Sequence, residues 1–149
     1  MMDAMLDRLQ NNFSSSILKM ELLRPRRVLL EIDPGILTEM ARWLYRENAC
    51  RFVIASGMDT GLRLEIIYHF SLDPDGLLIN LQVPLSYENA RVESLTGLFE
   101  AANWIEREIH EILGIEFINH PEMKPLVSDG NWEAGEYPYR KNQANKNRP

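Results

Sequence analysis

Residues 62–85 read LRLEIIYHFSLDPDGLLINLQVPL, and this stretch decides the fold. Two apolar runs, 62–72 and 77–85, flank Asp73-Pro74-Asp75-Gly76, whose composition is strongly turn-forming and whose glycine can adopt a positive φ. In the first run the apolar residues hold alternate positions, which is typical of a β-strand with one buried face. The stretch therefore predicts two antiparallel strands joined by a tight turn.

A third strand is expected before this pair. Residues 50–56, CRFVIAS, are strand-like, and residues 57–61, GMDTG, supply turn-forming side chains. Three successive strands with short connections predict an antiparallel meander. Farther upstream, residues 16–33 hold two short apolar runs around Arg24-Pro25-Arg26-Arg27, which favours a hairpin because a proline cannot donate to the ladder.

Two main helices are predicted around the meander. Asp33-Pro34 begins the first, since an aspartate can cap the free amides and proline fits the first helical position. The second covers residues 98–113, and Gly114 is placed to end it with a positive φ. A short amphipathic helix is also expected within residues 1–13. These elements predict an α+β fold, an antiparallel or mixed sheet with two main helices packed on it.

The segment after Gly114 has a different character. It carries large apolar and aromatic side chains with little periodicity, and such residues on irregular backbone, rimmed by charge, favour a docking surface for another chain. We therefore expect an α+β domain at residues 1–114 and an irregular C-terminal docking extension at residues 115–149. The apolar and aromatic residues of this extension are Phe117, Pro121, Met123, Pro125, Leu126, Trp132, Tyr137 and Tyr139.

Charge and cysteine content exclude several functions. The net charge of -6 opposes binding to nucleic acid or to anionic lipid, although residues 137–149 hold four basic and no acidic residues. The single cysteine, Cys50, cannot form an intramolecular disulfide or build a thiolate metal site or iron–sulfur cluster. No apolar run approaches the roughly 20 residues of a membrane span, and the first residues lack the order of a secretory signal. We therefore expect no metal site in this chain, and we expect another chain to carry any redox chemistry nearby.

The second main helix carries most of the charged candidates. Its apolar stripe consists of Leu98, Ala101, Ala102, Ile105, Ile109 and Ile112. From this stripe Glu106, Arg107 and His110 point away, whereas Glu108 borders the apolar side and should need a cationic or hydrogen-bonding partner. Arg107 and Glu111, four residues apart, are expected to pair along the helix. The candidate partners for Glu108 are Arg91, Arg107 and Arg140.

The same region resembles a known family. The motifs are Ser94-Leu95-Thr96, Ala102-Asn103-Trp104-Ile105-Glu106-Arg107-Glu108, Glu111-Ile112-Leu113-Gly114-Ile115, Phe117 and His120-Pro121. They are similar to the signature of the C subunit of NADH-quinone oxidoreductase, the complex I subunit of that class. The family has aspartate where this chain has Glu111, and its ending Gly-His-Pro-Leu-Arg-Lys-Asp-Tyr is only partly matched by residues 135–142, GEYPYRKN.

The resemblance implies an accessory subunit without a cofactor or active site of its own. The altered tail and short chain are more like the small homologous subunit of energy-converting, membrane-bound nickel-iron hydrogenases. The implied partners are the large catalytic subunit and the iron–sulfur subunit, with peripheral attachment to the cytoplasmic side of the membrane through them and no contact with nucleic acid. The interface and structural positions are Trp104, Glu106, Arg107, Glu108, Glu111, His120, Pro121, Tyr137, Pro138, Arg140 and Lys141.

Other interpretations stay open at this point. The same role in a NADH-quinone oxidoreductase differs only in the neighbouring subunits. A free-standing α+β module that holds a peptide or small ligand with its aromatic C-terminal segment would behave as a single ordered species in isolation. His120-Pro121 is expected to fix a turn in which His120 bonds backbone or a nearby acid, and a proton-relay role of this histidine is left open.

Overall fold

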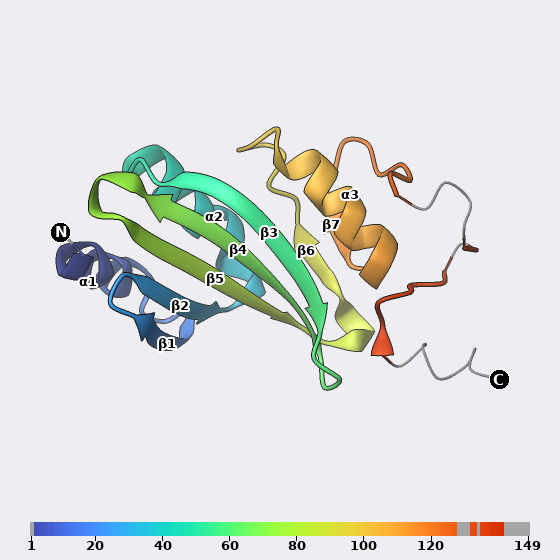
Figure 1. Ribbon diagram of the computed structural model, residues 1–149, viewed down its shortest axis with the longest axis horizontal. Helices are drawn as coiled ribbons and strands as arrows, with labels where there is room; N and C mark the ends of the chain where they lie inside the picture. Colours follow the sequence, from blue (N-terminus) through green and yellow to red (C-terminus); the bar gives the residue numbers. More distant parts are fainter. Residues whose placement is uncertain (1, 128–131, 134, 142–149) are drawn as a thin grey trace. The chain divides into compact units, whose positions relative to one another are not determined.

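The computed structural model describes residues 2–127, 132, 133 and 135–141. Within these residues it contains three α-helices, a five-stranded sheet of mixed direction and a parallel strand pair. This arrangement confirms the predicted α+β class (Figure 1). None of the helices in the described part of the chain is long and apolar enough to cross a membrane.

The five-stranded sheet has the order β1-β2-β5-β4-β3. The predicted hairpin is confirmed, because β1 and β2 pair antiparallel with Leu22 opposite Val28. Strand β2 also pairs in parallel with β5, with Val28 beside Ile79, so the hairpin is added to the meander through its second strand. The strands are β1 Ile17–Arg24, β2 Arg27–Ile32, β3 Arg51–Asp59, β4 Leu64–Leu72 and β5 Leu77–Leu85.

Turn residues behave as expected at one end of the meander and differently at the other. Gly76 follows the short 3-10 helix Asp73–Asp75 with φ 61°, as the Asp-Pro-Asp-Gly sequence predicts. The predicted turn over residues 57–61 is wrong, because β3 runs on to Asp59 and the turn lies at residues 60–63. There Thr60 exchanges backbone and side-chain hydrogen bonds with Arg63.

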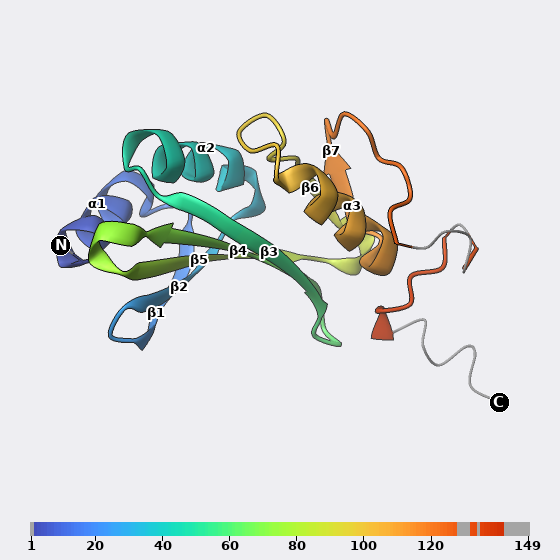
Figure 2. The ribbon, with the colours of Figure 1, turned by 45° about the horizontal axis from the view of Figure 1, so that its top comes forward.

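The backbone divides into two compact units, Met1–Ile54 with Ile67–Pro84 and Ala55–Ile66 with Leu85–Pro149. In the first unit, α1 (Met2–Phe13) buries Met5, Leu9 and Phe13, and its Phe13 ring meets the Trp43 ring edge to face. Asp33 caps the next helix by accepting the Gly35 amide, as predicted. That helix comprises the 3-10 turn Pro34–Ile36, α2 (Leu37–Arg42) and a π-helical turn, Trp43–Glu47 (Figure 2).

The second unit is built around α3 (Ala102–Leu113). Beside it lie β6 (Arg91–Glu93) and β7 (Glu116–Ile118), which pair in parallel, and the 3-10 turn Tyr87–Asn89. Gly114 ends α3 with φ 71° and donates its amide to the His110 carbonyl, so the predicted helix end is confirmed. Gly57 of β3 also belongs to this unit, and a Cβ placed there would lie 2.7 Å from Leu113 Cδ1.

Candidate docking site around helix α3

The buried stripe of α3 differs from the predicted one at its centre. The buried residues are Ala102, Glu106, Ile109, Glu111 and Leu113, whereas Glu108 is exposed. The prediction that Glu108 borders the core and Glu106 points away is therefore wrong. Glu106 follows Ala102 by four residues and precedes Ile109 by three, so it occupies a core position of the helical repeat.

The Glu106 carboxylate is held by the loop that precedes α3. Its Oε1 accepts the Leu95 amide at 2.7 Å and its Oε2 accepts the Ser94 hydroxyl at 2.6 Å. Ser94 Oγ in turn accepts the Thr96 amide and lies 2.7 Å from the Thr96 hydroxyl. The side chain of Glu106 is only 1% exposed. Burial raises the pKa of Glu106 from 4.5 to about 7, although the Ser94 and Leu95 hydrogen bonds oppose this shift.

His120 closes the other side of Glu106. Its Nε2 lies 3.1 Å from the Asn103 carbonyl oxygen and 3.8 Å from Glu106 Oε2, and its side chain is 1% exposed. Its Nδ1 accepts the Glu122 amide at 3.0 Å. In this arrangement Nδ1 acts as an acceptor, and Nε2, which faces a carbonyl oxygen, acts as the donor. His120 thus bonds backbone next to a buried acid, as the sequence predicts for the turn at His120-Pro121.

Arg107 and Glu111 both bind the segment 124–127. Arg107 donates through Nε to the Lys124 carbonyl at 2.8 Å and through Nη2 to the Pro125 carbonyl at 3.2 Å. The two carboxylate oxygens of Glu111 accept the Leu126 and Val127 amides, each at 2.6 Å. The positive side chain meets carbonyls and the negative one meets amides, so together they hold an irregular segment alongside α3.

The C-terminal end of α3 is covered by residues 137–141. The Tyr139 amide donates to the Ile112 carbonyl at 3.0 Å, and Arg140 Nε donates to the Leu113 carbonyl at 2.5 Å. These bonds satisfy carbonyls that a helix end leaves without an intrahelical partner. The Tyr137 ring lies against Gly114, where a Cβ would overlap it, and the Arg140 guanidinium lies 5.2 Å from the centre of that ring.

Asp59 anchors the same segment to the end of β3. Its Oδ1 accepts the Tyr87 hydroxyl at 2.5 Å and the Gly61 amide at 2.8 Å, and its Oδ2 accepts the Lys141 amide at 2.8 Å. Burial acts to raise the pKa of Asp59, but the hydrogen bonds from Tyr87, Gly61 and Lys141 outweigh it, so the pKa is lowered.

The remaining sequence candidates lie at the surface. Trp104 is 68% exposed and Tyr139 is 66% exposed. Glu108, Pro121, Pro138 and Lys141 are also exposed. The arginines proposed as partners of Glu108 are engaged elsewhere: Arg91 pairs with Glu116 at 3.1 Å, while Arg107 and Arg140 bind backbone carbonyls as above.

Sequence reasoning missed three of the residues that build this site. Ser94 lies in the motif region, but its distance from Glu106 along the chain does not predict that the two side chains are in contact. Asp59 is recognisable only as the start of an Asp-x-Gly turn, and Tyr87 has no signal at all in one sequence. Among the described residues no group of three or more His, Cys, Asp or Glu side chains is arranged to hold a metal ion.

This geometry defines a class of protein, an α+β scaffold whose buried charges tie loops to one helix and whose large aromatic side chains stay exposed. Residues 30–148 match the family described as respiratory-chain NADH dehydrogenase, 30 Kd subunit. The chain therefore belongs to this family.

Individual relatives agree with the family match. The C subunit of the F(420)H(2) dehydrogenase from Methanosarcina mazei is 32% identical over 147 residues, covering 94% of this chain and 91% of that protein. The C subunit of the NADH-quinone oxidoreductase from Xanthobacter autotrophicus is 33% identical over 118 residues, covering 75% of this chain and 55% of that protein. The chain thus matches little more than half the length of that relative.

A solved structure shares the fold. It is the membrane-bound sulfane sulfur reductase, an archaeal respiratory membrane complex, in which one chain matches with a TM-score of 0.80 at 19% identity. The match covers 94% of this chain and 84% of that chain.

Proposed function

We propose that this chain is a non-catalytic accessory subunit in the peripheral arm of a membrane-associated, complex I-like oxidoreductase. One observation carries the proposal: the titratable side chains of the signature, Glu106, Arg107 and Glu111, hold loops against α3. These hydrogen bonds fix the shape of the surface that the loops form around α3. The family membership supports the same role, and so do the names of two relatives, the C subunits of an F(420)H(2) dehydrogenase and of a NADH-quinone oxidoreductase.

The docking surface is proposed to lie on the second unit. This unit exposes Trp104 and Tyr139 beside the segments that the buried charges hold in place. Large aromatic side chains at a rigid surface are typical anchors of protein interfaces. The proposed docking extension, residues 115–149, includes these held segments, and its residues 128–131, 134 and 142–149 lie outside the described part of the chain.

We propose the large catalytic subunit as the chain that this surface contacts, with the iron–sulfur subunit as a further partner. Such contacts would attach the chain peripherally to the membrane, on its cytoplasmic side. The host complex proposed from the sequence is an energy-converting nickel-iron hydrogenase. The relative from Methanosarcina mazei, matched over nearly its whole length, supports an alternative host with another electron donor, namely an F(420)H(2) dehydrogenase.

The test is native purification of the chain from its own source in mild detergent, followed by mass spectrometry of the co-purifying subunits. We expect a large catalytic subunit and iron–sulfur subunits to be recovered in fixed stoichiometry. A nickel-iron subunit would identify a hydrogenase, NADH- and flavin-binding subunits a NADH-quinone oxidoreductase, and F420-binding subunits an F(420)H(2) dehydrogenase. Recovery as a lone, monodisperse protein would overturn the subunit proposal and favour a free-standing binding module.

A further inference from the structure

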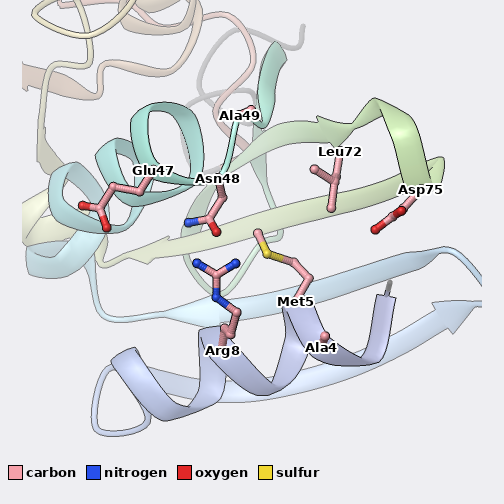
Figure 3. A pocket seen from close by; sticks show the side chains of 8 residues that line it. All are labelled: Ala4, Met5, Arg8, Glu47, Asn48, Ala49, Leu72 and Asp75. Atoms are coloured by element: carbon pink, nitrogen blue, oxygen red, sulfur yellow. The ribbon is translucent and has the colours of Figure 1, made fainter.

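The first unit contains a surface pocket of about 380 Å³. None of the residues that line it was proposed above for docking. It lies between α1, the end of the π-helical turn and the β4–β5 connection (Figure 3). Its volume falls within the range of pockets that bind small molecules. The charged, polar and large apolar side chains that line it belong to Met5, Arg8, Glu47, Asn48, Leu72 and Asp75.

Asn48 brings an unused acceptor to this pocket. Its Nδ2 donates to the Trp43 carbonyl at 2.9 Å, which fixes the orientation of the amide. Its Oδ1 is buried and has no hydrogen-bond partner among the described residues. A buried polar atom without a partner costs free energy, so this oxygen calls for a donor from outside the described residues.

The backbone at this point is also unusual. Asn48 follows the π-helical turn Trp43–Glu47, and Ala49 has φ 53°, which residues with a Cβ adopt only rarely. π-helical turns and left-handed non-glycine residues both occur frequently at functional sites. Here they place the Asn48 amide at the wall of the pocket.

Arg8 brings an unused donor to the same pocket. Its guanidinium lies 5.4 Å from the centre of the Trp43 ring, and within the described part of the chain it forms no ion pair or side-chain hydrogen bond. Figure 3 shows the Arg8 head group directed from α1 toward the Asn48 amide, with the Met5 side chain beside it. A guanidinium held over a tryptophan ring keeps N–H groups available for a planar anion.

We infer that this pocket binds a carboxylate whose neighbouring carbon carries an N–H donor. The carboxylate pairs with Arg8, the N–H donates to Asn48 Oδ1, and the attached apolar side chain rests on Met5 and Leu72. Glu47 and Asp75 make the rim acidic, which disfavours a more highly charged anion such as phosphate. Two sources share this chemistry, the C-terminal residue of a polypeptide and a free amino acid.

The experiment is a titration of the full ¹⁵N-labelled chain followed by amide chemical shifts. N-acetyl-L-leucine represents the end of a polypeptide, L-leucine represents a free amino acid, and N-acetyl-L-leucinamide lacks the carboxylate. We expect at least one of the two carboxylates to shift the amides of Arg8, Asn48 and Ala49 saturably, and the tighter binder identifies the source. The amide is expected to bind at least tenfold more weakly.

Variants separate the proposed contact from general effects of charge and folding. Arg8→Met keeps an apolar stem against Trp43 and is expected to raise the Kd at least tenfold, while Arg8→Lys gives an intermediate Kd. Arg46→Met removes an exposed arginine of the π-helical turn that does not line the pocket, and it should leave the Kd unchanged. The inference is overturned if neither carboxylate binds at millimolar concentration, if the amide binds equally well, or if Arg8→Met binds as tightly as the wild type.

Discussion

At the scale of single residues, Glu106 is the most informative position. It is an acid at a core position of α3, and no lysine or arginine of the described part of the chain contacts it. Two hydrogen bonds from Ser94 and Leu95 compensate only part of its desolvation, which is why its pKa rises to about 7. The charge of this residue therefore depends on pH within the physiological range.

The first prediction concerns this pH dependence. Because the pKa of Glu106 is higher in the folded chain than in the unfolded chain, its stabilising contribution is complete below about pH 4.5 and is lost as the pH rises through about 7. The loss amounts to roughly 3 kcal/mol of unfolding free energy. Glu106→Gln should remove this part of the dependence, as measured by urea unfolding at pH 5, 6, 7 and 8. Glu108→Gln, at an exposed position, should keep the wild-type dependence, and an unchanged dependence in Glu106→Gln would contradict the prediction.

The second prediction concerns Asp59, which holds Lys141 by a backbone hydrogen bond. Asp59→Ala removes the acceptor for Lys141, Tyr87 and Gly61 together, so we expect about 1–3 kcal/mol of destabilisation. Hydrogen exchange of the Lys141 amide should become faster by at least tenfold. Tyr87→Phe is the matched control, because it removes one bond and leaves the Lys141 amide with its acceptor. Equal protection of the Lys141 amide in Asp59→Ala and the wild type would refute this role.

At the scale of elements, α3 sits closely on β3 because Gly57 has no side chain. A Cβ at Gly57 would lie 2.7 Å from Leu113 Cδ1 and 3.0 Å from Ile109 Cγ2. The glycine that looks like a turn residue in the sequence is thus a packing residue inside a strand. The helix is then fixed at its C-terminal end by Tyr139 and Arg140, which bond its last carbonyls.

The third prediction follows from this close packing. Gly57→Val should destabilise the chain by about 1–3 kcal/mol because α3 must move away from β3, even though valine is a good strand former. Gly97→Val is the control, since a Cβ there meets nothing within 4 Å. Thermal and urea unfolding of both variants measure the difference. A Gly57→Val chain as stable as the Gly97→Val chain would show that the helix does not pack here.

At the scale of the whole molecule, an exposed aromatic residue can be substituted to test docking with little effect on the stability of the fold. Trp104 is 68% exposed on a helix whose other side is buried, so the fold gains little from the indole itself. A tryptophan at such a position is suited to fill a pocket on a partner.

The fourth prediction is that Trp104→Ala reduces recovery of partner subunits in native purification at least tenfold while the melting temperature of the isolated chain changes by less than about 2 °C. Leu18→Ala, which shortens a 57% exposed leucine on β1 in the first unit, should leave recovery unchanged. Full recovery of partners with the Trp104→Ala chain would place the docking surface elsewhere.

Local patterns in the chain were sufficient for most elements. The strand within residues 62–72, the Asp-Pro-Asp-Gly turn, the Asp33 cap and the Gly114 helix end each depend on neighbours in sequence, and all were predicted, although the strand begins at Leu64 and leaves Leu62 in the turn. The parallel pairing of β2 with β5 was covered only by the broader expectation of a mixed sheet, because it joins segments about fifty residues apart.

The sequence by itself determined the α+β class, the order of the helices and of the five strands of the large sheet, and the family resemblance, since these depend on spacing and residue type. It did not predict the short strands β6 and β7. Only the tertiary structure decided which of Glu106 and Glu108 is buried, and that Gly57 packs against α3. It also decided that Arg107 and Glu111 form hydrogen bonds with the segment 124–127. Burying a carboxylate requires donors, and the donors for Glu106 come from Ser94 and Leu95, eleven or more residues away in the chain. A contact of that kind is set by how the loops pack on the helix, which helical periodicity does not specify.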